Sequence, residues 1–193
     1  MSIAEKLTAI AENVPKVYEA GQKSEYDRFW DAYQNNGNVV EGYGMFCGNQ
    51  WTDETYQPKH PIKVSLGTQL FRNARITDIV VPVDISGAVG NMYFNSCIKL
   101  VTIPKLIVNE NTTFLTAFAY CYELEEVRFE GTIVNSLDLH WSTKLSYDSV
   151  ANIFGHLGGT ASATLTLPKS HDDGRYNSLI ANKMPPNWAV SWM

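Results

Sequence analysis

Large apolar residues recur at a fixed spacing through the middle of the chain. Ile76, Leu100 and Leu124 are evenly spaced, and Leu145 follows after a slightly shorter interval. Each of the four has a large apolar residue six positions before it, and these are Leu70, Phe94, Phe118 and Leu139. Three positions after Ile76, Leu100 and Leu124 there is again an apolar residue: Ile79, Ile103 and Val127. Self-similarity at such a fixed period is the sequence signature of a chain built from stacked repeats.

A small side chain that can form hydrogen bonds stands three positions before each of these reference residues. Extending the frame back by one further period reaches Thr52, with Phe46 six positions before it, in a degenerate copy. The five small residues are Asn49, Asn73, Cys97, Cys121 and Ser142. A stacked coil leaves inward backbone groups that water cannot reach, so we predict these side chains inside. We therefore predict that Cys97 and Cys121 are buried residues rather than nucleophiles. Cys47 lies outside this pattern, and no role is assigned to it.

The pattern predicts an α+β repeat solenoid of the leucine-rich-repeat type, with a period of about 24 and four to five copies over residues 38–146. Residues 147–193 would form a helix and strand cap, because an open repeat end has to be covered. Helical spacing of Val150, Ile153, Phe154 and Leu157 predicts a helix that starts at Ser146 or Asp148 and stops at Gly158. We further expect an edge strand over 163–167, a short helix with Tyr176, Leu179 and Ile180, and a last strand over 188–192.

The pattern of residues 1–37 predicts a separate helical segment that serves attachment or oligomerisation. Five apolar residues step by four and three along it, as in a coiled-coil seam: Ile3, Leu7, Ile10, Val14 and Val17. The same stripe could pack on the repeat region, since both uses need one apolar face, and Pro15 interrupts it. Residues 24–34 predict a further helix.

Alternation along the strands after the reference positions indicates a candidate binding face. Ile79, Val81, Ile103, Val127 and Phe129 are expected to point inward. Their neighbours would form one outward stripe: Asp78, Val80, Thr102, Pro104, Glu126 and Arg128. The alternative for each is an ordinary solvated position.

Composition and motifs argue against several classes of function. The net charge is −5, with no cluster of Lys and Arg, so nucleic acid is not an expected partner. No apolar run is long enough to enter a membrane, and residues 1–21 lack the features of a secretory signal, so we expect synthesis in the cytoplasm without a signal peptide. The four histidines share no metal-binding spacing, and the His171-Asp172-Asp173 segment reads as a solvated turn. We therefore expect no enzyme activity, no catalytic or metal residues, and no cofactor.

The sequence resembles one known family. The pattern F-x-x-C-x-x-L-x-x-V/I in residues 94–103 and 118–127 resembles the BspA-type leucine-rich repeat of bacterial surface and prophage-encoded proteins. Residues 2–21 and 26–37 are similar to the leader of repeat proteins from phage structural gene clusters of gut Firmicutes. Family members usually carry more repeats and an export signal, a difference that favours a phage particle component over a secreted adhesin.

The resemblance implies a non-enzymatic structural or recognition protein of a phage or prophage particle. Its expected partners are a protein or a cell-surface glycan, with a homo-oligomer formed through the N-terminal helix. One alternative is a carbohydrate-binding module or adhesin of a bacterial surface, because five Trp and ten Tyr offer rings for sugars. A cell-wall-acting enzyme is the third.

Overall fold

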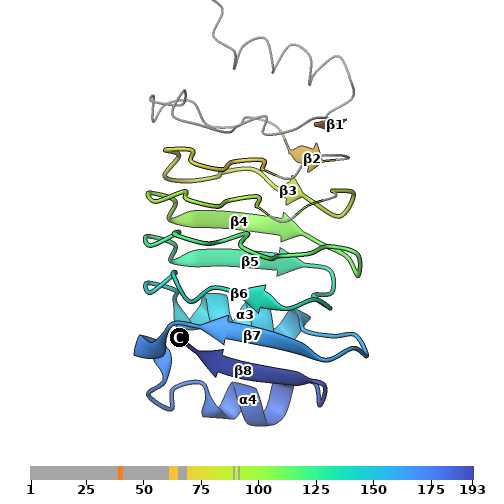
Figure 1. The fold of residues 1–193 in the computed structure, drawn as a ribbon, viewed down its shortest axis with the longest axis vertical. Coiled ribbons are helices and arrows are strands. Elements are labelled where there is room, and N and C mark those ends of the chain that lie inside the picture. The colour runs from red at the N-terminus through yellow and green to blue at the C-terminus, as the bar shows by residue number, and fades with distance from the viewer. Residues whose placement is uncertain (1–38, 41–60, 65–68, 89, 91) are drawn as a thin grey trace, which may run out of the picture. The chain divides into compact units, whose positions relative to one another are not determined.

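The computed structural model describes residues 39–40, 61–64, 69–88, 90 and 92–193 (Figure 1). The chain divides into two units, Met1–Gly37 and Asn38–Met193, and every described residue belongs to the second. The N-terminal seam, the helix expected over 24–34, the repeat copy around Thr52, and Cys47 lie outside the described residues.

Five short strands form a parallel sheet in chain order. They are β1 (Val39–Val40), β2 (Ile62–Val64), β3 (Val83–Asp84), β4 (Thr102–Ile107) and β5 (Glu126–Glu130). The sequence interval between paired residues changes along the sheet. It is shorter than predicted where Ile62 pairs with Val83 and where Val83 pairs with Leu106. The interval equals the predicted period between β1 and β2, between Asp78 and Thr102, and in the first part of the β4–β5 pairing, as between Thr102 and Glu126.

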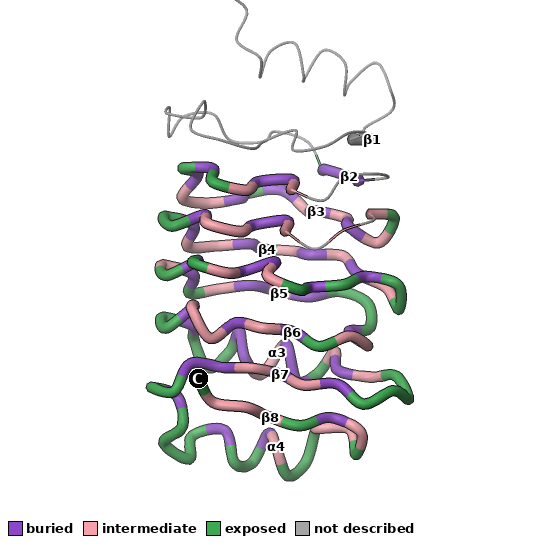
Figure 2. The backbone as a smooth tube through the Cα atoms, viewed as in Figure 1, coloured by how far each residue is buried: buried purple, intermediate pink, exposed green. Residues whose placement is uncertain are grey.

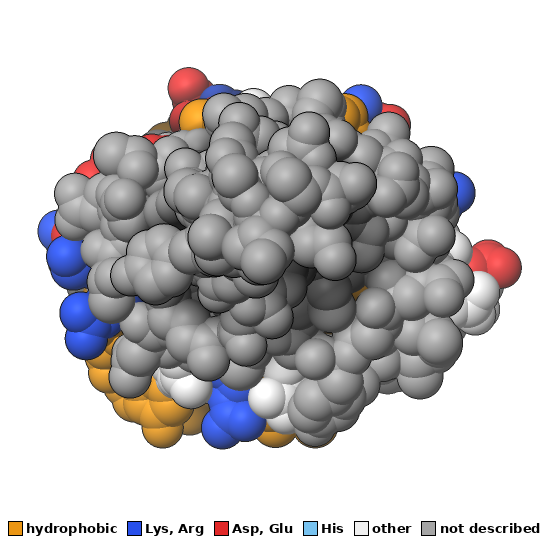
Figure 3. Space-filling view, turned by 90° about the horizontal axis from the view of Figure 1, so that it is seen from above, with side chains coloured by type: hydrophobic (Ala, Val, Ile, Leu, Met, Phe, Trp, Pro, Cys, Tyr) orange, Lys and Arg blue, Asp and Glu red, His pale blue; other side chains and the backbone are white. Residues whose placement is uncertain are grey.

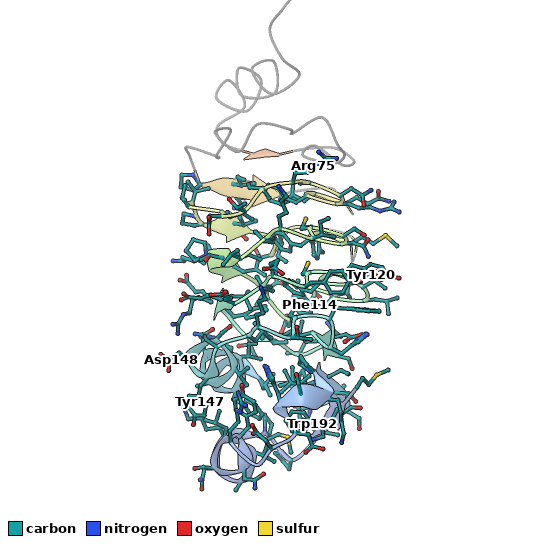
Figure 4. The ribbon with its side chains drawn as sticks, turned by 90° about the vertical axis from the view of Figure 1, so that its left-hand side faces the viewer. Arg75, Phe114, Tyr120, Tyr147, Asp148 and Trp192 are labelled. Atoms are coloured by element: carbon teal, nitrogen blue, oxygen red, sulfur yellow. The ribbon has the colours of Figure 1, made fainter. Side chains whose placement is uncertain are left out.

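A second parallel sheet follows, made of β6 (Leu137–Asp138), β7 (Ala163–Leu167) and β8 (Trp188–Trp192). Its strands point in the opposite direction to those of the first sheet (Figure 1). Helices α3 (Tyr147–His156) and α4 (Asn177–Lys183) separate these strands in the chain, and a 3-10 turn covers Lys169–His171. Figure 4 shows both helices on the side of the first sheet and β7 on the other. After β5, helices therefore take the place of strands on one side while strands form on the other.

The turns that precede the first-sheet strands stack on one another. The Phe71 and Phe94 rings stack with their centroids 5.5 Å apart, and those of Phe94 and Phe118 stack at 5.4 Å. The Cys97 thiol donates to the Phe71 carbonyl over 2.8 Å, and the Cys121 thiol donates to the Phe94 carbonyl over 3.1 Å. The predicted internal position of both cysteines is confirmed, and Figure 2 shows buried residues recurring from turn to turn.

The first described turn departs from the predicted frame by one position. Asn73 is exposed, and the buried position belongs to Ala74, whose amide hydrogen-bonds to the Phe71 carbonyl as the Cys97 amide does to that of Phe94. Phe71 is therefore the equivalent of Phe94, although the predicted frame assigned that place to Leu70. Ser142 does occupy the expected buried position, but its hydroxyl has no hydrogen-bond partner among the described residues.

The predicted fold class, an α+β leucine-rich-repeat solenoid of four or five copies with a helical N-terminal segment and a C-terminal cap, is wrong. The described residues form two small parallel sheets and two α-helices, an α/β arrangement. The physical reason lies in the pairing. The interval between strand partners varies, from that of Ile62 with Val83 to the much wider one of Leu137 with Leu165, and the first sheet ends at β5 instead of continuing. The recurring apolar positions predict that the turns stack, but they do not predict which part of each turn becomes a strand.

Several individual elements after Leu145 match the prediction. Helix α3 begins after Ser146, whose hydroxyl accepts a hydrogen bond from the Ser149 amide, and it buries Val150, Ile153 and Phe154. The strands over 163–167 and 188–192 are confirmed as β7 and β8. The expected edge position of the first is wrong, because β7 pairs with β6 on one side and β8 on the other.

Helix α3 closes the free edge of β5 with side chains. The Ser149 hydroxyl accepts from the Val127 amide over 3.0 Å and donates to the Val127 carbonyl over 3.1 Å. The Asn152 side-chain oxygen accepts from the Phe129 amide over 2.7 Å. Three backbone groups of β5 that a further strand would have paired are thus satisfied by a helix.

Candidate binding site

Two successive turns carry a group of exposed or half-buried rings. The first turn covers residues 118–124 and the second covers 139–145. In the first, the inward side chain is that of Cys121, and its neighbours Tyr120 and Tyr122 are 43% and 41% exposed. In the second, His140 and Trp141 are half-buried beside inward Ser142. We call Tyr120, Tyr122, His140 and Trp141 the turn cluster.

The rings of the turn cluster contact one another across the two turns. The Tyr120 and Trp141 centroids are 4.7 Å apart with planes tilted by 36°. Tyr122 meets Trp141 edge to face at 5.7 Å and 86°, and His140 lies 4.6 Å from Trp141. Tyr120 lies on the side away from Tyr147 of α3 (Figure 4). Figure 3 shows hydrophobic side chains gathered at the lower left of the view.

Tyr120 has a backbone conformation that its side chain disfavours. Its φ is 63°, in the left-handed region, as is that of Ser96 at the equivalent position one turn earlier. A bulky residue there is unusual, and the conformation costs roughly 1–2 kcal/mol for a residue with a Cβ atom. The same conformation recurs at Asn73 and Ser96 in the two preceding turns, so it belongs to the turn itself. What distinguishes Tyr120 is a large, exposed ring at that position.

The polar groups beside the rings are bound to one another. Asp138 Oδ1 lies 2.6 Å from His140 Nδ1, and the Lys144 ammonium is paired with the Glu123 carboxylate. The hydrogen bond that the Lys144 ammonium donates to Glu123 raises the pKa of Lys144. His140 and Lys144 are the basic side chains of these two turns, and both already have an acidic partner.

The buried thiol beneath the rings does not offer a nucleophile. Cys121 is fully buried, and burial raises the pKa of its thiol to about 12. A thiol that stays protonated at neutral pH is inert. The turn cluster therefore offers binding surfaces and hydrogen-bonding groups.

The structure brings three of the stripe residues predicted from alternation side by side. Asp78 pairs with Thr102, and Thr102 pairs with Glu126, across neighbouring runs of the first sheet. Val80 and Pro104 are exposed, and Pro104 falls where the β4–β5 register shifts, a position suited to a residue without an N–H. The Arg128 guanidinium donates to Glu126 over 2.6 Å.

The inward residues expected between the stripe positions are confirmed. Ile79, Val81, Ile103, Val127 and Phe129 are all buried. The Glu126 and Arg128 side chains of the stripe are bonded to each other, so the turn cluster is the better candidate for binding a partner.

The rings of the turn cluster were not singled out from the sequence. Alternation was read along the expected strands, whereas these rings lie in the turns before them. The sequence signal that could have identified them is the position of Cys121. When a turn residue points inward, its two neighbours point away from the core, and both neighbours of Cys121 are Tyr.

Comparison of the chain with family models, curated proteins and solved structures found no match. Within the described part of the chain, no group of three His, Cys, Asp or Glu side chains is arranged to hold a metal ion. None of the described helices is long and apolar enough to cross a membrane.

Proposed function

We propose that this protein is a non-enzymatic recognition protein that binds a protein or a glycan on a cell surface. The observation that supports this proposal is the exposed Tyr120 packed beside Tyr122 and Trp141. Exposed aromatic side chains supply large contact areas at a low cost in side-chain entropy and are enriched at binding surfaces. The stripe at Asp78, Thr102 and Glu126 is a secondary surface for the same role.

We further propose that the protein works as part of a phage or prophage particle. This setting rests on the similarity of residues 2–21 and 26–37 to the leaders of repeat proteins from phage structural gene clusters. Its test is proteomic. Particles induced from a strain that carries the gene, and purified on a density gradient, should contain peptides of this chain in the particle band. If peptides are found only in the soluble fraction, the protein is not part of the particle, and only the proposed binding function is retained.

Binding to cells is tested with the full-length, fluorescently labelled protein and a panel of bacterial strains measured by flow cytometry. We expect labelling of at least one strain and its loss in Tyr120→Asn, because Asn tolerates the left-handed conformation but removes the ring. Tyr147→Ala is the matched control, since Tyr147 is 47% exposed and lies on the opposite side (Figure 4). No labelling of any strain, or equal labelling by both variants, contradicts the proposal.

A further inference from the structure

The rings of the turn cluster are not coplanar, so their faces point in different directions. Tyr122 stands nearly perpendicular to Trp141, at 86°, while Tyr120 is tilted by 36° to Trp141 and by 60° to Tyr122. Both Tyr side chains are more than two-fifths exposed. A ligand can therefore lay an apolar face on one ring and touch a second ring with its edge.

The charged and basic groups of these two turns do not favour a charged ligand. The basic side chains of the two turns are His140 and Lys144, and each already contacts a carboxylate. An anionic ligand would have to displace Glu123 to reach the Lys144 ammonium. A cationic ligand would compete with Lys144 for Glu123 and with the His140 hydrogen bond for Asp138. A neutral ligand needs neither exchange.

The same groups offer hydrogen bonds to hydroxyls. Asp138 and Glu123 are 44% and 43% exposed, so carboxylate oxygens remain open to solvent beside the rings. His140 Nδ1 faces Asp138, which leaves the second ring nitrogen, Nε2, for another partner. Apolar surface with a few polar groups at its rim is the usual construction of a small-molecule site.

We propose that the turn cluster binds a neutral sugar ring of a cell-surface glycan, with its C–H face on Tyr120 or Tyr122 and its hydroxyls toward Asp138, Glu123 and His140. A pyranose combines these two features, an apolar C–H face and a rim of hydroxyls. This inference rests on the proposed recognition function and names its ligand class.

The test uses the full-length protein on an array of immobilised oligosaccharides, with neutral glycans ending in hexose or N-acetylhexosamine and anionic glycans ending in sialic acid. Titration calorimetry with the strongest soluble binder then gives the affinity. We expect binding to neutral glycans, with at least about a tenfold loss of affinity in both Tyr120→Asn and Tyr122→Ala, because one buried ring contact is worth at least that factor. Tyr147→Ala should bind as the unchanged protein does.

A second arm separates failure of this inference from failure of the proposed function. Bacterial cells that bind the protein are treated either with periodate, which oxidises sugar diols, or with protease. Loss of labelling after periodate alone supports the sugar ligand. Labelling that disappears after protease alone, while Tyr120→Asn still abolishes it, overturns the sugar ligand and keeps recognition of a surface protein. A preference for sialylated glycans also overturns the inference, as does glycan binding unaffected by both Tyr variants.

Discussion

Two opposing contributions to stability meet at Tyr120. Its left-handed backbone is unfavourable by roughly 1–2 kcal/mol, but its ring contacts Trp141 at 4.7 Å, and such aromatic pairs contribute about 0.5–1.5 kcal/mol. The two effects nearly cancel.

Tyr120→Asn should therefore leave stability almost unchanged. We expect the free energy of unfolding, measured by urea titration, to differ from that of the unchanged protein by less than about 1 kcal/mol, because relief of backbone strain offsets the lost ring contact. Tyr120→Val is the contrasting variant, since a β-branched residue loses the ring and keeps the strain. Equal destabilisation by Asn and Val would contradict this account of the conformation.

A second residue, His171, is buried without a carboxylate partner among the described residues. It is 4% exposed, its Nε2 lies 3.1 Å from the Thr143 carbonyl, and its Nδ1 lies 3.4 Å from the Tyr176 hydroxyl. These contacts fit the neutral ring, with Nε2 donating to Thr143 and Nδ1 accepting from Tyr176. Burial lowers the pKa of His171, Arg175 lowers it further, and the hydrogen bond to Thr143 and the charge of Asp173 oppose the shift.

This shift predicts acid sensitivity. Because the folded pKa of His171 lies below the ordinary value of 6.5, the unfolded chain binds the proton first as the pH falls. The free energy of unfolding should therefore decrease below about pH 6.5 and go on decreasing until native His171 is itself protonated. Denaturant titrations at pH 7.5 and pH 5.5 should show a smaller difference for His171→Gln than for the unchanged protein. Identical differences would exclude His171 as the cause.

At the scale of elements, α3 is both a helix and the end of the first sheet. Ser149 is fully buried, and its one hydroxyl satisfies the amide and the carbonyl of Val127. A buried backbone group that loses its partner costs about 1–3 kcal/mol.

Ser149→Ala should accordingly destabilise the protein by about 1–3 kcal/mol, because the Val127 amide is left without an acceptor. Ser178→Ala in α4, where the serine is exposed, is the matched helix control and should change stability by less than about 0.5 kcal/mol. Chemical denaturation of both variants measures the difference. A Ser149→Ala protein as stable as the control would mean that α3 does not seal the strand through this side chain.

Some of the elements could be predicted from the sequence, and others could not. Helix α3 was predictable because Val150, Ile153 and Phe154 share one face and Ser146 is a good N-cap. The inward Cys97 and Cys121 were predictable because small hydrogen-bonding residues recurred at one position. The change of sheets after β5 was not, since Leu137 and Leu165 pair across a wider interval than the recurring positions indicate. The slip by one position at Asn73 and Ala74 was not predictable either, because the interval from Phe71 to Phe94 is one residue shorter than the predicted frame.

At the scale of the whole molecule, the sequence predicts self-association through the N-terminal segment. The seam residues Ile3, Leu7, Ile10, Val14 and Val17 lie outside the described residues, so this remains a prediction. Two heptads of apolar spacing are the basis for it.

Leu7→Glu combined with Ile10→Glu should convert an oligomer to single chains, because two charges would enter the apolar seam. Light scattering of the full-length protein measures the mass. Thr8→Glu adds a charge outside the seam and should leave the oligomer intact. An unchanged protein that already has the mass of one chain would refute oligomerisation through this segment.

The contacts of Ser149 and Asn152 with β5 also bear on solubility at high concentration. An open strand edge is a template on which identical chains can add indefinitely, and such growth ends in fibres. Because two short side chains occupy the donors and the acceptor that a newcomer would use, this edge of the first sheet does not recruit further copies. The protein should thus reach high concentration without polymerising at this edge.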